Sequence, residues 1–117
     1  MSQITTHVLD TTRGKPAKGL PITLFAQTGD SWQQLATGIT NTDGRVADLL
    51  ADDVVLAAGI YRMHFATKPY FASHNETGFY PYVDIVFELD DASHNSDSHY
   101  HIPLLLTAFG YSTYRGS

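Results

Sequence analysis

The chain has 117 residues, the usual length of one domain, and is long enough to bury a hydrophobic core without disulfides or a structural metal. Apolar residues make up 43% of the chain and charged residues 16%, a composition that excludes an intrinsically disordered protein. Seven basic and twelve acidic side chains give a net charge of −5, which argues against nucleic acid and anionic membranes as partners. We expect a single domain that spans residues 1–117.

Cysteine is absent, which excludes a disulfide framework, a thiolate nucleophile and a zinc finger. The first four residues contain neither the basic nor the apolar region of a signal peptide, and no run of 18 apolar residues occurs. A chain without cysteine fits a reducing compartment. We therefore expect a cytoplasmic protein.

Apolar residues recur at every second position in several short segments, which is the pattern of β-strands with one face in a core. The clearest example is Val-Asp-Ile-Val-Phe-Glu-Leu at 83–89, where two of the three residues between the alternating apolar positions are acidic. In chain order, the predicted strands cover residues 3–10, 22–27, 32–37, 45–50, 60–65, 83–89, 99–106 and 110–115.

Turn-forming residues separate these strands. Glycine and proline predict a loop at 14–19, Thr-Gly-Asp-Ser at 28–31 suits a hairpin, and Asn-Thr-Asp-Gly at 41–44 tolerates positive φ. Residues 69–75 begin with proline and predict one or two helical turns, and the polar 90–98 segment predicts an exposed loop. Short strands with turn signals at intervals of about 8–12 residues predict an all-β sandwich or barrel.

Six histidines occur in the chain, and this side chain gives and takes protons near neutral pH. His7 lies in the first predicted strand. His99 and His101 share a face of a later strand, because side chains at i and i+2 point the same way. A surface or interface position is the more common role for any one histidine. With His94, this pair also forms a weak candidate set of metal ligands, which no cysteine or carboxylate completes.

Two further features are candidates for a functional site. Arg45 follows the turn at 41–44, and a guanidinium there either lies on the surface or binds a planar, partly anionic ligand. The aromatic strand pattern at 111–114 continues to within three residues of Ser117, which indicates that the end of the chain has a function.

Several catalytic motifs are absent. The sequence has no Gly-x-Ser-x-Gly, no glycine-rich phosphate loop before a helix and no His-Glu-x-x-His. Adjacent carboxylates at 52–53 and 90–91 diverge on an extended chain, so we do not expect either pair to act in acid/base catalysis.

Three segments carry a resemblance to a known family. They are Ile-Thr-Thr-His-Val-Leu-Asp at 4–10 with Gly-Lys-Pro-Ala at 14–17, Thr-Asp-Gly-Arg at 42–45, and His-Tyr-His-Ile-Pro-Leu-Leu-Leu at 99–106 with Tyr-Ser-Thr-Tyr-Arg-Gly-Ser at 111–117. They resemble, in the expected order, the signatures of the 5-hydroxyisourate hydrolases, the transthyretin-related proteins. The terminal Tyr-Arg-Gly-Ser is the most specific element, because it separates these hydrolases from the hormone-carrying transthyretins.

The resemblance implies a transthyretin-like β-sandwich of two four-stranded sheets with one short helix. It implies a homotetramer, built as a dimer of dimers, with active sites in clefts at the dimer–dimer interface. The implied activity opens 5-hydroxyisourate to 2-oxo-4-hydroxy-4-carboxy-5-ureidoimidazoline in urate degradation, with no cofactor and no metal. The residues implied as catalytic are His7, Arg45, His101 and Ser117, and those implied as substrate-binding are His7, Arg45, Tyr114, Arg115, Gly116 and Ser117.

On this basis we expect water to attack a cyclic amide of the substrate. His7 and His101 would orient and deprotonate the water, and Arg45 would stabilise the charge that develops. Arg115 and Ser117 would close the pocket and position the substrate. Covalent attack by Ser117 stays open, but the sequence gives it no dedicated base and orienting carboxylate, so we favour direct water attack.

Two other functions remain as alternatives. A non-enzymatic transthyretin-like carrier of small ligands would use the same cleft, since a fold does not fix a function. An apolar lining is expected for such a carrier, in contrast to two histidines and two arginines. A structural or metal-storage protein would use the histidine-rich segment 94–101.

Overall fold

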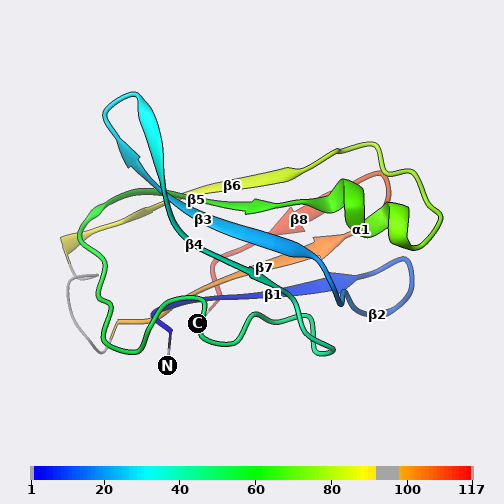
Figure 1. Ribbon diagram of the computed structural model, residues 1–117, viewed down its shortest axis with the longest axis horizontal. Helices are drawn as coiled ribbons and strands as arrows, with labels where there is room; N and C mark the ends of the chain where they lie inside the picture. Colours follow the sequence, from blue (N-terminus) through cyan, green and yellow to red (C-terminus); the bar gives the residue numbers. More distant parts are fainter. Residues whose placement is uncertain (1, 92–97, 117) are drawn as a thin grey trace.

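The computed structural model describes residues 2–91 and 98–116, and these form two four-stranded sheets that pack face to face (Figure 1). The first sheet has the order β2-β1-β7-β8 and the second the order β4-β3-β5-β6. The first sheet consists of β1 (Ile4–Asp10), β2 (Lys15–Pro16), β7 (Tyr100–Leu106) and β8 (Tyr111–Thr113). The second consists of β3 (Pro21–Thr28), β4 (Ser31–Ile39), β5 (Gly59–Phe65) and β6 (Val83–Leu89). The predicted β-sandwich with one short helix is therefore confirmed.

Strand β1 pairs on both sides, antiparallel with β2 and parallel with β7. In the parallel pair Ile4 lies opposite Tyr100 and Asp10 opposite Leu106, so the first and last long strands of the chain lie side by side (Figure 1). Burial alternates along β1 as the sequence predicts. The residues facing the interior are Ile4, Thr6, Val8 and Asp10, and those on the outer face are Thr5, His7 and Leu9.

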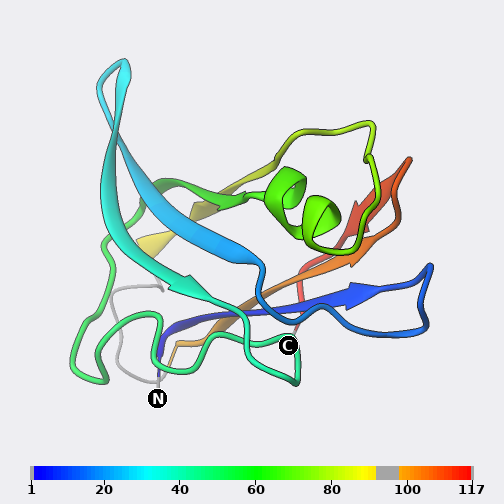
Figure 2. The ribbon, with the colours of Figure 1, turned by 45° about the vertical axis from the view of Figure 1, so that its right-hand side comes forward.

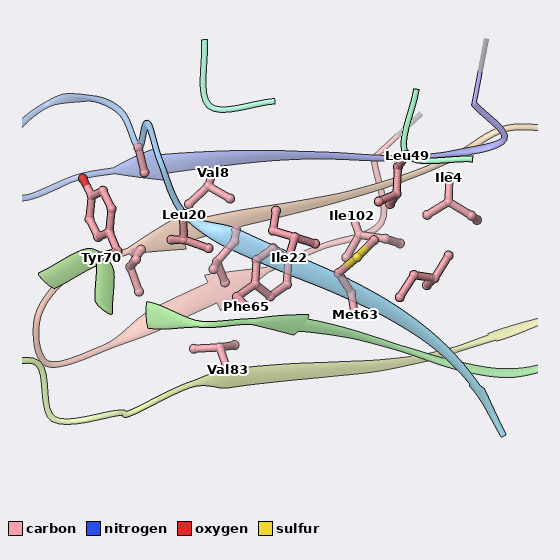
Figure 3. Close-up of a cluster of buried hydrophobic side chains, with 14 of the residues drawn as sticks. Ile4, Val8, Leu20, Ile22, Leu49, Met63, Phe65, Tyr70, Val83 and Ile102 are labelled. Carbon is pink, nitrogen blue, oxygen red and sulfur yellow. The ribbon is translucent and has the colours of Figure 1, made fainter. Parts of the chain in front are cut away.

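The core lies between the two sheets and receives apolar side chains from both (Figure 3). Val8 from β1 and Ile102 from β7 meet Ile22 from β3 and Phe65 from β5, and all four are buried. Burying one such side chain contributes about 1.5–3 kcal/mol to stability. This core fixes the two sheets relative to each other, and with them the outer face of the β1–β7 pair.

Helix α1 (Thr67–Ser73) lies between β5 and β6 in the chain and packs at one end of the sandwich (Figure 2). It begins two residues before the predicted turns at 69–75, and Pro69 lies in its first turn, where a backbone N–H has no helical acceptor. The Tyr70 hydroxyl donates to Asp10 Oδ2 at 2.6 Å, and Arg13 donates to the same oxygen at 2.7 Å. These bonds tie the helix to the end of β1.

The predicted strand at 45–50 is wrong. Only Arg45 forms a bridge there, and the following residues make turns. Leu49 and Leu50 are nevertheless buried, because the loop folds back over the start of β1 (Figure 3). The Ser2 hydroxyl accepts the Leu50 N–H at 3.0 Å, and Gln3 Oε1 accepts the Leu56 N–H at 2.8 Å. Side-chain oxygens therefore satisfy backbone N–H groups that a strand would pair with a neighbouring strand.

Smaller differences concern the loops. The segment predicted as a loop at 14–19 contains β2, which pairs Lys15 with Asp10 and Pro16 with Leu9. Strand β8 is shorter than the predicted 110–115. Most of the loop predicted at 90–98 lies outside the described residues. Within the described residues, no helix has the length and apolarity that a membrane crossing requires.

Candidate active site

The parallel pairing of β1 with β7 brings Thr5 and His101 together on the outer face of the first sheet. The two residues are direct partners in the register, although 96 positions separate them in the chain. His7 lies two residues further along the same face of β1. All three side chains are partly exposed, which leaves them accessible to a small molecule.

Arg45 reaches this face because a tight turn places its backbone against β1. Arg45 and His7 form an antiparallel bridge, and the neighbouring Val8 N–H donates to the Gly44 carbonyl at 2.8 Å. Asn41 Oδ1 accepts the backbone N–H groups of both Asp43 and Arg45, at 2.9 and 3.1 Å. The turn is therefore fixed by its own asparagine before it contacts β1.

Gly44 is required at this turn for two reasons. Its φ of +75° lies in the left-handed region that side chains rarely adopt, and an added Cβ would collide with the Val8 carbonyl oxygen. The glycine thus allows the close approach that places Arg45 beside His7.

The chain after β8 returns to the same face. Gly116 forms an antiparallel bridge with His101, and its N–H donates to the His101 carbonyl at 2.9 Å. A Cβ at position 116 would lie 2.6 Å from His101 Cδ2, so a glycine is needed for the chain to pass over the imidazole. Figure 2 shows this segment and the loop after β4 approaching the β1–β7 pair. Ser117 lies outside the described residues.

A cleft of about 530 Å³ opens at this position, and we call it the histidine cleft. Its lining includes Thr5, Asn41, Arg45, Asp48, His99 and His101. His7 adjoins the cleft through its bridge to Arg45. The structure therefore brings together three of the predicted catalytic residues, His7, Arg45 and His101, from three distant segments of the chain.

Both imidazoles are held toward their neutral form. Burial lowers the pKa of His7, and the Arg45 charge lowers it further, while Asp43 acts in the opposite direction. Burial is also the largest cause that lowers the pKa of His101, followed by the charges of Arg45, His7 and His99. A neutral imidazole has a free lone pair and can act as a base.

Tyr114 and Arg115 lie in a different place within one chain. They line a second cleft of about 330 Å³ beside β6 and β7, which we call the edge cleft. The Arg115 guanidinium lies 5.1 Å from the centre of the Tyr100 ring. Apolar side chains such as Ile85 and Phe87 form much of the remaining lining. Of the C-terminal residues predicted to bind substrate, only Gly116 contacts the histidine group among the described residues.

Polar residues of the histidine cleft that have no catalytic or substrate-binding role in the sequence-based prediction include Thr5, Asn41 and His99. The Thr5 hydroxyl lies 2.9 Å from His101 Nδ1 and 3.1 Å from His99 Nε2. The shared face of His99 and His101 was visible in the sequence, but their common contact with Thr5 depends on which strand pairs with β1. Among the described residues, no group of three or more His, Cys, Asp or Glu side chains is arranged to hold a metal ion, and His94 lies outside them.

The arrangement is suited to hydrolysis of a small polar molecule. Two neutral imidazoles provide bases for water, and a guanidinium provides charge-assisted hydrogen bonds to an oxygen that becomes negative.

Comparison with known proteins gives concordant matches. A family model described as the HIUase/Transthyretin family matches residues 4–116. The chain is 44% identical to 5-hydroxyisourate hydrolase 2 of Rhizobium meliloti, over 98% of this chain and 96% of that protein. The structure of Klebsiella pneumoniae 5-hydroxyisourate hydrolase matches with a TM-score of 0.83 and 34% identity, over 99% of this chain and 100% of the other. Sea bream transthyretin in complex with thyroxine matches with a TM-score of 0.88 and 31% identity, over 98% and 95% of the two chains.

Proposed function

The chain belongs to the HIUase/transthyretin family, and from this premise we propose that it hydrolyses 5-hydroxyisourate in the histidine cleft. It is a hydrolase of urate breakdown, as its relatives named 5-hydroxyisourate hydrolase indicate. The product is 2-oxo-4-hydroxy-4-carboxy-5-ureidoimidazoline, in which water has opened one cyclic amide of the substrate.

The observation that carries the assignment to this cleft is the convergence of three functional groups. Backbone bridges hold Arg45 against His7 and Gly116 against His101, so the positions of these groups do not depend on flexible side chains alone. Catalytic groups need such preorganisation, because a displacement of about 1 Å can cost a hundredfold in rate.

In the proposed reaction, an imidazole takes one proton from water as the water oxygen bonds to the amide carbon. Arg45 stabilises the negative charge that forms on the carbonyl oxygen. The carbon–nitrogen bond then breaks, and the imidazolium returns the proton to the departing nitrogen. His7 and His101 are the candidate bases.

The C-terminal residues complete the proposed site. Gly116 holds the His101 ring by close packing of its backbone. Ser117, the next residue, is assigned to substrate positioning, and direct water attack is preferred to covalent attack by its hydroxyl. Contacts of Tyr114 and Arg115 with substrate stay a prediction for the assembled oligomer.

The likeness to sea bream transthyretin in complex with thyroxine makes a ligand carrier the second candidate function. The lining of the histidine cleft favours the hydrolase, because Arg45, His99 and His101 place cationic or ionisable groups where an apolar ligand would need apolar ones.

Assembly and location are also part of the proposal. We assign the chain, as one domain of residues 1–117, to a homotetramer in the cytoplasm. Strands β6 and β8 each end a sheet, and a sheet edge offers unpaired backbone groups to a second subunit.

The decisive experiment generates 5-hydroxyisourate from urate with urate oxidase and follows its ultraviolet decay with and without this protein. We expect fast, saturable decay, and a loss of at least about a hundredfold in His7→Ala or His101→Ala if that residue is the base. His74→Ala, an exposed histidine after α1, serves as the control and should retain activity. Decay that the wild-type protein does not accelerate would refute the hydrolase, and full activity in both folded site variants would refute the site.

A further inference from the structure

The Thr5 hydroxyl lies between two imidazoles in the histidine cleft. Its oxygen is 2.9 Å from His101 Nδ1 and 3.1 Å from His99 Nε2, both within hydrogen-bond distance. Thr5 is the second residue of β1 and lies directly opposite His101 in the register of the parallel β1–β7 pair. The backbone ladder therefore sets the position of Thr5, and the imidazole rings of His99 and His101 both lie against its hydroxyl.

A hydroxyl group has one proton, so it can donate to only one ring at a time, and two arrangements place that proton between Thr5 and an imidazole. In one arrangement Thr5 donates to His101 Nδ1 and accepts the Nε2–H of His99. In the other arrangement Thr5 donates to His99 Nε2 and accepts the Nδ1–H of His101. Of these two, only the second arrangement leaves the lone pair of His101 on Nε2, the ring nitrogen that lies away from the Thr5 hydroxyl.

We propose that Thr5 is a positioning residue that holds His101 in the Nδ1–H tautomer, with His99 as the acceptor of the Thr5 proton, so that His101 Nε2 serves as the base. The proposal rests on the hydrolase function assigned above and deepens it, because it specifies which atom takes the proton from water.

The second arrangement is the one that also suits the protonated state of His101. When Nε2 takes a proton, the ring carries N–H groups on both nitrogens and needs an acceptor at Nδ1. Thr5 is already that acceptor, so no hydrogen bond has to reorganise during the step. In the first arrangement Thr5 would have to turn its proton away from His101 at the same moment.

Gly116 supports the same ring from its other edge. The ring edge that carries Cδ2 lies against the Gly116 backbone, while the edge that carries Nδ1 faces Thr5. A rotation of the ring that exchanged these two edges would lose the Thr5 hydrogen bond and place a nitrogen against the glycine. Both contacts therefore fix the direction in which Nε2 points.

Two substitutions of Thr5 test the role of its hydroxyl separately from the role of its branched side-chain shape. Thr5→Val keeps the branched side chain, which suits a β-strand, and removes the hydroxyl, whereas Thr5→Ser keeps the hydroxyl. We expect Thr5→Val to lower kcat about tenfold or more with KM nearly unchanged, since the base remains but loses its preferred tautomer. Thr5→Ser should restore most of the rate. Thr23→Val, the same change on the other sheet, is the matched control.

Nitrogen NMR of histidine-labelled full-length protein tests the tautomer without any turnover. The His101 signals, identified by their loss in His101→Gln, should show the proton on Nδ1 in the wild type and a shift toward Nε2 in Thr5→Val. A wild-type His101 with its proton on Nε2, or an unchanged kcat in folded Thr5→Val, overturns the proposal. Because the NMR result does not need substrate, failure of the hydrolase assignment would be recognised separately, by the absence of accelerated decay in the wild type.

Discussion

At the scale of single residues, the positive charge of Arg45 lowers the pKa of the two imidazoles beside it. It is the second-largest influence on the pKa of both His7 and His101, after burial, and it lowers both values. A cation disfavours a second positive charge nearby, so the neutral base persists to more acidic pH than for a free histidine. Arg45 therefore has two roles in the proposed reaction, one toward the substrate oxygen and one toward the bases.

This gives a prediction for the pH dependence. The rate constant kcat/KM should rise with pH along an acid limb whose apparent pKa is below about 6.5, the ordinary histidine value. Arg45→Gln removes the cation, so the pKa of both imidazoles rises and the acid limb moves to higher pH, in addition to a loss of rate. Arg45→Lys keeps the charge and should keep the position of the limb. Initial rates between pH 5 and about 8 measure this, and an identical limb in Arg45→Gln would contradict it.

A second prediction concerns Gly116. Gly116→Ala adds a Cβ only 2.6 Å from His101 Cδ2, so the ring or the chain must move. We expect kcat to fall about tenfold or more, because catalytic groups tolerate little displacement. Gly110→Ala is the matched control, since its Cβ would meet Thr107 Oγ1 at an ordinary 3.8 Å. Equal activity of the two variants would show that the ring tolerates the contact.

The sequence predicted the histidines and the arginine of the site but not the threonine between them. His7, Arg45 and His101 are residue types whose chemistry is recognisable in any context, and the resemblance supplied their grouping. Thr5 is an ordinary strand residue by pattern. Its role follows from the parallel register with β7, and the pairing partner of a strand is not encoded in its local alternation.

At the scale of elements, the loop between β4 and β5 shows where local pattern misleads. Residues 45–50 contain apolar side chains and were predicted as a strand, but Asp48 has a φ of +55°, which no regular strand contains. Two leucines of the loop are buried all the same. Burial was thus predictable from hydrophobicity, while the path of the backbone was decided by its contacts with Ser2 and Gln3.

The loop should therefore be sensitive to the start of the chain. Ser2→Ala leaves the Leu50 N–H without its acceptor in a buried position, and we expect the free energy of unfolding to fall by about 1–3 kcal/mol. Ser31→Ala, an exposed hydroxyl in the β3–β4 hairpin, should change it by less than about 0.5 kcal/mol. Urea denaturation of both variants provides the measurement. A Ser2→Ala protein as stable as the wild type would show that a water molecule accepts the Leu50 N–H in place of the hydroxyl.

At the scale of the whole molecule, exposed apolar side chains lie on or next to the edge strands β6 and β8. Val86 on edge strand β6 is 58% exposed, and Tyr114, which follows edge strand β8, is 60% exposed. Large exposed apolar groups on sheet edges are typical of surfaces that pair with another subunit. This supports the proposed homotetramer.

We expect light scattering to give about four times the 12.9 kDa mass of the chain. Val86→Lys places a charge on the β6 edge and should lower this mass, since edge lysines oppose strand pairing. Gln33→Lys on β4, the opposite edge of the same sheet, should leave it unchanged. A monomeric wild-type protein, or the same mass for both variants, would count against assembly through β6.

The parallel pairing of β1 with β7 has a consequence for the order of events during folding. Strand β1 must wait until β7 has been synthesised before its ladder is complete, so contacts of very long sequence separation hold the first sheet together. Such topologies fold slowly, because a long loop must close before it is stabilised. Nascent chains halted before residue 100 would keep one side of β1 open to chaperones, and the catalytic group would assemble only after the final strands had been synthesised.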